Sequence, residues 1–209
     1  MRIALFPLNT VLFPGGVLPL RVFEARYMDM VRDCMREQQP FGVCLITQGA
    51  EVGQPARTEE VGCLAHIGDW DMQQLGVLNI RCRGGQRFRI LERAVESNGL
   101  ARARVELIED DEDCPLAPEH ASCADLLRRI IDDQRTQAAL LAEQEGGETA
   151  PGLPFDPPFQ LDSSTWVGNR ICEVLPVPLK AKQKLMELDD AHTRLAIITQ
   201  YLKQHAVLK

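Results

Sequence analysis

The sequence predicts an α+β fold in which a β-rich domain precedes a helical bundle. Three observations support this prediction. Short apolar runs with period-two alternation fill the chain up to residue 108, an acidic stretch with prolines follows, and apolar residues then recur at helical spacing. We therefore expect two domains, residues 1–110 and residues 111–209.

The β-rich part contains about seven candidate strands. Ile3 to Leu20 carries no charge, but three prolines and the pair Gly15-Gly16 interrupt it, which favours two buried strands over a membrane span or signal peptide. Five further runs are separated by Gly, Pro, Gln and Asn turns: 41–47, 61–70, 75–82, 87–95 and 100–108. This spacing is typical of a small barrel or sandwich.

One amphipathic helix is expected among the strands, at Glu24 to Arg36, where Tyr27, Val31 and Cys34 recur at helical spacing.

The run of acids at 109–113 predicts a solvated linker, after which the pattern becomes helical. Residues 119–145 carry one apolar stripe, and residues 146–162 are rich in Pro and Gly, as in an irregular loop. The remaining helices have predictable starts. Ser163 or Ser164 can cap one, Pro178 can begin the next, and Asp189 or Asp190 can cap the last.

Composition and charge limit the partners and the cellular compartment that we expect for this chain. The net charge of −7 opposes binding to nucleic acid or anionic lipid. The seven cysteines include no C-x-x-C pair and fall mostly in apolar runs, which is typical of reduced, buried thiols. Cytoplasmic residence is the expectation that follows.

Sequence motifs for several enzyme classes do not occur. No lysine follows a glycine, so there is no phosphate-binding G-x-x-x-x-G-K loop, and no two glycines are spaced for a dinucleotide fingerprint. No serine lies in the G-x-S-x-G motif of α/β-hydrolases. A Ser-Lys hydrolase would pair Ser163 or Ser164 with Lys180 or Lys182, but helix capping already accounts for these serines. We expect no enzymatic activity and no cofactor.

Several short segments, in order, resemble the N-terminal or substrate-binding domain of Lon proteases. The matching segments are FPL at 6–8, LFPG at 12–15, PLRVFE at 19–24, RY at 26–27, FGV at 41–43, VGCLAHI at 61–67, GQRFRI at 85–90, KQKLME at 182–187 and RL at 194–195. The resemblance spans nearly the whole chain and implies a PUA-like β pseudo-barrel followed by the helical bundle. Full-length Lon proteins continue into an ATPase and a protease, and the sequence has no segment that resembles either one. The resemblance therefore implies a stand-alone domain that binds without catalysis.

The implied partner is an unfolded or extended polypeptide, in the setting of a protease or chaperone system and not at a membrane. The candidate contact residues lie in the matching N-terminal segments: Phe13, Arg21, Phe23, Arg26 and Tyr27.

An alternative is RNA binding, because PUA-like folds include RNA-binding proteins. If residues 79–90 form a two-stranded hairpin, alternation leaves Arg81, Arg83, Arg87 and Arg89 on one face. No aromatic residue alternates with these arginines to stack on bases. Peptide binding is therefore the preferred hypothesis, and nucleic acid is not an expected partner.

Cys114, His120 and Cys123 lie within ten residues of one another and are candidate metal ligands. Their spacing matches no standard zinc motif and supplies three ligands where a structural zinc takes four. The sequence therefore predicts no metal.

Overall fold

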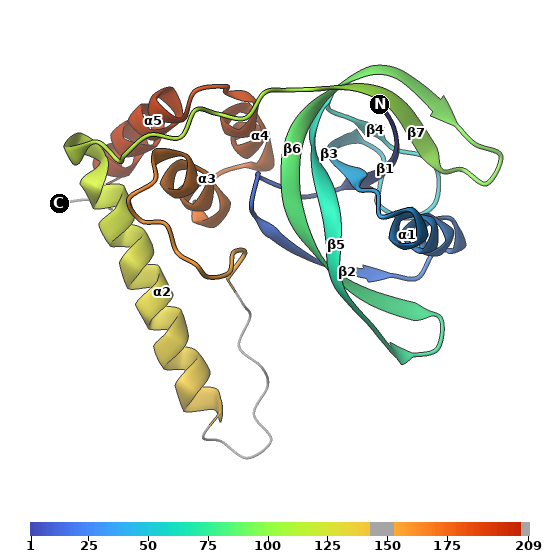
Figure 1. Cartoon of the computed structure of the whole chain (residues 1–209), viewed down its shortest axis with the longest axis horizontal. Helices are drawn as coiled ribbons and strands as arrows, with labels where there is room; N and C mark the ends of the chain where they lie inside the picture. The colour runs from blue at the N-terminus through green and yellow to red at the C-terminus, as the bar shows by residue number, and fades with distance from the viewer. Residues whose placement is uncertain (143–152, 206–209) are drawn as a thin grey trace. The chain divides into compact units, whose positions relative to one another are not determined.

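The computed structural model describes residues 1–142 and 153–205, which form two compact units (Figure 1). The first unit contains residues 1–110 and 177–187, and the second contains residues 111–176 and 188–209. The first unit thus includes the segment 177–187 as well as residues 1–110. The expected division into domains 1–110 and 111–209 stays a prediction.

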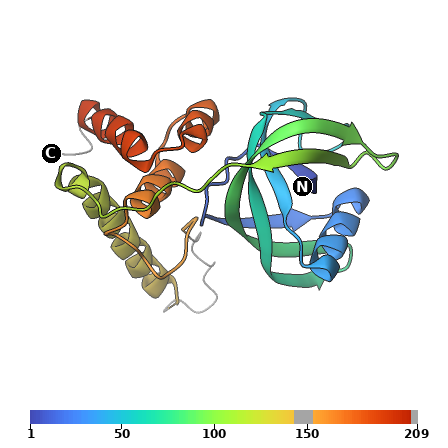
Figure 2. The same ribbon diagram turned by 45° about the horizontal axis from the view of Figure 1, so that its top comes forward.

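The first unit is built on a ring of five strands, β1, β7, β6, β5 and β3. Neighbouring strands pair in that order, and a parallel pairing of β1 with β3 closes the ring. Figure 2 shows these strands curving around one another. Two more strands extend the sheet, β2 on β6 and β4 on β3. The strands are β1 (Arg2–Leu8), β2 (Val17–Val22), β3 (Phe41–Gln48), β4 (Arg57–Thr58), β5 (Val61–Gln74), β6 (Val77–Val95) and β7 (Ala101–Leu107).

Two hydrophobic clusters lie on opposite faces of these strands, because β side chains alternate. Successive residues of β1 show this. Leu5 belongs to the smaller cluster, together with Phe88 and Ile90 of β6, whereas Phe6 belongs to the larger one. The smaller cluster draws its residues from β1, β3, β5, β6 and β7, the five strands of the ring, so it forms the core inside the ring.

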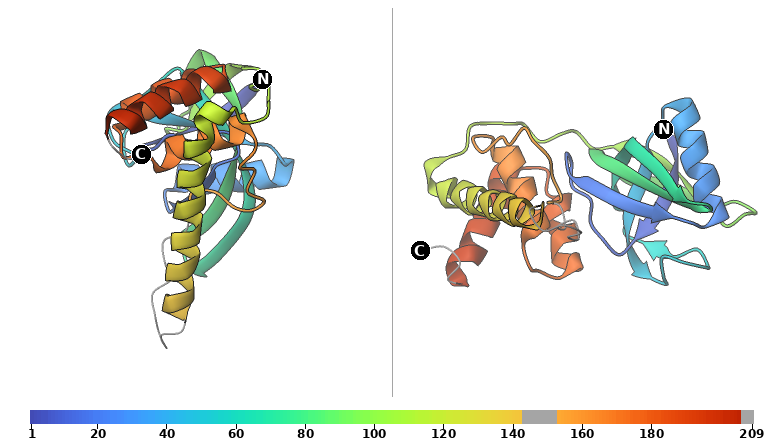
Figure 3. Two further views of the ribbon diagram at one scale, coloured as in Figure 1. Left: turned by 90° about the vertical axis from the view of Figure 1, so that its left-hand side faces the viewer. Right: turned by 90° about the horizontal axis from the view of Figure 1, so that it is seen from below.

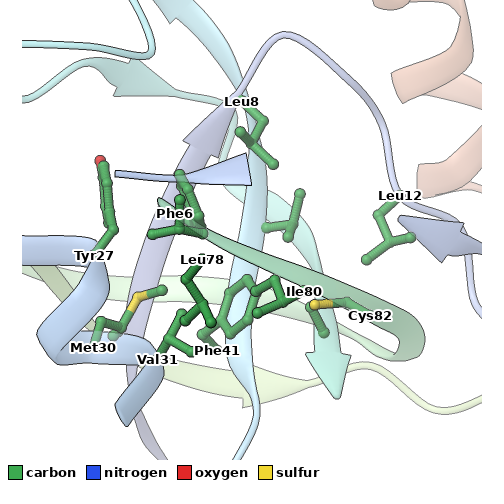
Figure 4. Packing of buried hydrophobic residues seen from close by; sticks show 14 of the residues in the cluster. Phe6, Leu8, Leu12, Tyr27, Met30, Val31, Phe41, Leu78, Ile80 and Cys82 are labelled. Carbon is green, nitrogen blue, oxygen red and sulfur yellow. The ribbon is translucent and has the colours of Figure 1, made fainter. Parts of the chain in front are cut away.

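The larger cluster lies beneath helix α1 (Ala25–Glu37), which is the amphipathic helix that the sequence predicts. Its residues Tyr27, Met30 and Val31 lie near Phe41 and Leu78 of the sheet (Figure 4). The α+β fold with a barrel-like ring and one packed helix is therefore confirmed.

The expected hairpin at residues 79–90 is wrong, because residues 77–82 and 87–95 of the two runs belong to the single strand β6. The pair Gly84-Gly85 predicts a turn, but in the structure it lies within the strand, where the backbone of Gly84 packs against Phe13. A Cβ on Gly84 would lie 2.1 Å from the carbonyl oxygen of Phe13, so a glycine is required where these two segments meet. The turn lies instead at Leu75-Gly76, between β5 and β6, where Gly76 has φ +81°.

Helix α4 (Leu179–Glu187) belongs to the first unit because polar side chains bind it to the strands. Gln183 donates a hydrogen bond to the carbonyl of Val61 at 2.9 Å. Arg87 of β6 donates to the carbonyl of Met186 at 3.1 Å, in the last turn of the helix, where carbonyls have no partner within the helix.

In its described residues, the second unit contains the short 3-10 helix η1 and three α-helices, seen from two further directions in Figure 3. These are η1 (Pro118–His120), α2 (Ala121–Ala142), α3 (Ser164–Val174) and α5 (Ala191–Gln204). Ser163 and Asp190 cap α3 and α5, as predicted. Residues 143–145 of the expected helix and 146–152 of the expected loop lie outside the described residues.

Within the described residues, no helix is both long enough and apolar enough to cross a membrane.

Candidate functional site

The β5–β6 hairpin extends beyond the rest of the sheet (Figure 1). Strand β3 pairs with β5 only at Cys63–Ala65, whereas β6 pairs with β5 as far as Gln74. In the part of the chain that the structure describes, residues 66–74 therefore have a strand partner on one side only. Their other edge keeps backbone donors and acceptors that an added strand could use.

This hairpin exposes large apolar side chains. Trp70 is 57% exposed, Met72 is 43% exposed, and Leu75 at the turn is 96% exposed. A single exposed apolar residue is ordinary, but three on one hairpin form a surface that is typical of an interaction site.

A groove of about 340 Å³ lies between the hairpin and helix α1. Its wall on the hairpin side consists of Trp70, Met72 and Leu78. The residues on the α1 side are Met28, Asp29, Val31, Arg32 and Met35. Methionine side chains are unbranched and adapt to different partners, so this lining suits apolar groups of varied shape. The charged pair Arg32–Asp29, with its atoms 2.7 Å apart, supplies the polar part of the lining.

A second pocket, of about 240 Å³, contains three of the predicted contact residues, Arg21, Phe23 and Tyr27. Phe23 is more than half exposed, and Arg21 reaches the hairpin through a hydrogen bond to Gln74 at 3.4 Å. Tyr27 is buried and stacks on Phe6, with ring centroids 4.1 Å apart. Burial raises the pKa of Tyr27, so its phenol stays neutral.

The other two predicted contact residues have structural partners. Arg26 is buried, with an ion pair to Glu24 at 3.0 Å and a hydrogen bond to the carbonyl of Gly99 at 3.0 Å. Phe13 is fully buried, so its ring cannot contact a ligand at this surface. The structure thus brings Arg21, Phe23 and Tyr27 together and leaves Phe13 in the interior.

The four arginines of the expected hairpin, Arg81, Arg83, Arg87 and Arg89, do not form one exposed face. Arg87 is 1% exposed and donates to the carbonyls of Met186 and Glu109, at 3.1 and 3.2 Å. Arg81, Arg83 and Arg89 are exposed. A shift in register opposite Cys63 to Ala65 separates the two halves of the strand, so the halves pack against different clusters.

The two cysteines among the candidate metal ligands, Cys114 and Cys123, have separate partners. Cys114 lies with its Sγ 3.1 Å from Oγ of Ser164, whereas Cys123 and His120 both contact Oγ1 of Thr199.

Sequence reasoning missed the exposed residues Trp70, Met72 and Leu75. Leu75 directly precedes Gly76, and an apolar residue at a turn is the signal that could have identified them. Assigning the turn to Gly84-Gly85 concealed that signal.

Comparison with known proteins gives relatives along the whole chain. A Lon protease from Anaeromyxobacter dehalogenans is 28% identical over 214 residues, covering 96% of this chain but 23% of its own length. The chain thus spans about a quarter of that relative. The crystal structure of a Lon N-terminal domain protein from Xanthomonas campestris has a TM-score of 0.75 and 35% identity, covering 96% of this chain and 98% of that one.

The N-terminal domain of a Mycobacterium avium complex Lon protease matches with a TM-score of 0.62 and 14% identity, covering 98% of this chain and all of the other, which shows the fold. The family model for the ATP-dependent protease La (LON) substrate-binding domain matches residues 2–204. With nearly its entire length matched, this chain belongs to the Lon substrate-binding domain family.

Proposed function

We propose that this chain binds extended polypeptide segments that carry apolar side chains, and that it catalyses no reaction itself. The observation that carries the proposal is the exposed apolar surface of the β5–β6 hairpin, together with the groove between this hairpin and α1. Family membership supports substrate recognition as the role of such a surface.

Two physical features suit an extended peptide. The free edge of residues 66–74 can form backbone hydrogen bonds with an added strand, which depend little on peptide sequence. Alternate side chains of that strand can then enter the groove beside Trp70 and Met72. Tryptophan is prominent among residues that dominate binding energy at interfaces, because it buries a large area with few rotatable bonds.

The pocket at Arg21 and Phe23 is a second contact in this proposal. Arg21 already contacts Gln74 of the hairpin, so a peptide on the hairpin can continue toward Phe23.

The test uses Trp70 as its own reporter. The chain has two tryptophans, so Trp166→Phe leaves Trp70 as the single indole. Titration with a peptide of alternating Leu and Ser should shift Trp70 emission to shorter wavelength as the ring leaves water. A peptide of the same length without apolar residues should cause no shift.

Variants then locate the contact. These variants are made in the chain that keeps Trp166, and binding is followed by the anisotropy of a labelled peptide. Trp70→Ser combined with Met72→Ser should weaken peptide affinity about tenfold or more. Leu91→Ser is the matched control, because Leu91 is an exposed apolar residue on β6 outside the groove, and it should leave affinity unchanged. Equal losses in both variants, or in neither, would contradict the proposed surface.

RNA binding is the competing outcome of the same titration. The three exposed arginines of the candidate RNA-binding set, Arg81, Arg83 and Arg89, could neutralise about three phosphates, which predicts a slope of roughly −2 for log affinity against log salt. Peptide binding by apolar burial should change little with salt. Specific RNA affinity with the steep slope, lost in Arg81→Ala with Arg83→Ala and unmatched by any peptide, would refute the proposal.

The non-catalytic part is tested by incubating purified protein with ATP and with unfolded casein. We expect no turnover. Turnover that survives further purification and disappears on substitution of one side chain would refute this part alone.

A further inference from the structure

Three potential metal ligands meet in the second unit: Glu119 and His120 of η1, and His192 of α5. One ligand atom from each lies within 4.8 Å of the other two. The rings of His120 and His192 pack edge to face, with centroids 5.2 Å apart.

The helices hold this group in place. His192 lies in the first turn of α5, whose N-terminus Asp190 caps by accepting hydrogen bonds from the backbone of His192 and Thr193. Thr199 lies two turns further along, on the same face of the helix, and contacts His120. One face of α5 thus supplies both a potential ligand, His192, and the group that orients the His120 ring.

The His120 ring is prepared to accept a metal. It is 4% exposed, and its Nδ1 lies 2.9 Å from Oγ1 of Thr199. Its Nε2 is buried and has no hydrogen-bond partner among the described residues. A buried polar atom without a partner is costly, so this nitrogen points to a ligand. A hydrogen bond at one ring nitrogen that leaves the other for the metal is the usual arrangement of metal-binding histidines.

The charged or ionisable groups that act on the His120 ring are His192 and Lys203, which oppose a cation there, and Glu119, which favours one.

We propose that Glu119, His120 and His192 form a site for one divalent transition-metal ion, with zinc as the best match. Two imidazoles and one carboxylate are ligands that zinc accepts, and a fourth position remains for water. Ligand atoms around tetrahedral zinc lie roughly 3.3 Å apart, so the group must contract slightly. Glu119 and His192 are exposed and can move, whereas the buried His120 fixes the position of the site.

The experiment uses the untagged full chain after treatment with a chelator. Calorimetric titration with zinc chloride should show one equivalent bound, and cobalt(II) should give the visible absorption of a four-coordinate ion. His192→Ala and Glu119→Gln should each weaken zinc binding about tenfold or more. Because both side chains are exposed, circular dichroism should show that these variants are folded. His120 is not substituted in this test, because replacing a buried side chain could itself unfold the chain.

Matched controls separate this site from other ligands. His205→Ala removes another exposed histidine of the same unit, and Cys114→Ser removes the exposed thiol, so both should bind zinc like the parent chain. Affinity should fall as the pH is lowered from 7.5 to 5.5, because protons compete for the imidazoles.

No binding by the parent chain, or binding unaffected by His192→Ala and Glu119→Gln, would overturn the proposal. Thiolate-to-metal charge transfer in the cobalt spectrum, lost in Cys114→Ser, would overturn it in favour of a cysteine site.

Discussion

Replacing Gly42 with alanine should destabilise the first unit through a contact inside the ring of strands. A Cβ at this position would lie 2.6 Å from Cζ of Phe88 and 2.8 Å from Cδ1 of Ile3. Carbon atoms pack at about 3.5–4.0 Å, so Phe88 must move by roughly 1 Å. Neither side chain has free space, because both are almost fully buried.

The expected magnitude combines two opposing effects. Overpacking of a tight core costs about 1–3 kcal/mol. Alanine also restricts the unfolded chain, which offsets about 0.4–1 kcal/mol. We expect the free energy of unfolding to fall by about 1–2 kcal/mol, which lowers Tm by roughly 2–8 °C for a chain of this length.

Gly68→Ala is the matched control, because it adds the same methyl group to a neighbouring strand. The nearest atom to its Cβ is the carbonyl oxygen of Arg81 at 3.5 Å, an ordinary contact. This variant should be stabilised by about 0.4–1 kcal/mol through the unfolded state. The two alanine variants should therefore change stability in opposite directions.

Calorimetry measures Tm, and hydrogen exchange in β6 assigns the change to the first unit. Phe88→Leu shortens the side chain that Gly42→Ala would meet, so the double variant should lose less stability than the sum of the single variants. Equal stability of the Gly42 and Gly68 variants, or strict additivity with Phe88→Leu, would refute this account of the core.

Three further predictions concern the second unit and the cysteines. Ser163→Ala removes the hydroxyl that accepts the backbone N–H of Trp166 at 2.9 Å, and should lower the free energy of unfolding by about 1 kcal/mol in denaturant titrations. The pKa of His120 is lower in the folded chain, so the unfolded chain binds more protons below about pH 6.5. With a chelator present, the free energy of unfolding should therefore fall as the pH is lowered from 7.5 to 5.5, and it should fall less in His120→Asn. Maleimide should modify the exposed Cys114 well before Cys44, whose pKa burial raises to about 12, and Cys114→Ser should remove that fast reaction in mass spectra.

Local features were predictable from the sequence because neighbouring residues determine them. The apolar spacing in residues 24–36 predicts α1, and Ser163 and Asp190 cap the helices that follow them. Capping depends on a side chain and the backbone two or three residues later, so no distant contact is required. The alternating runs before residue 108 similarly predict a β-rich unit, and the ordered family segments extend this to a barrel-like ring.

Other features were decided by contacts between distant segments. Gly84 predicts a turn by its local preference, but the approach of Phe13 makes it a position within one long strand, and the candidate arginine hairpin disappears with that turn. Pro178 predicts where a helix begins, but it does not show that Arg87 binds the last turn of α4.

Both candidate sites depend on such long-range contacts. The free edge of β5 exists because β3 pairs with only three of its residues, a register that no local pattern specifies. The metal ligands come from η1 and α5, and their approach follows from the packing of Thr199 against His120. Sequence periodicity determines which face of an element is apolar, whereas the partner of that face is decided only when the whole chain packs.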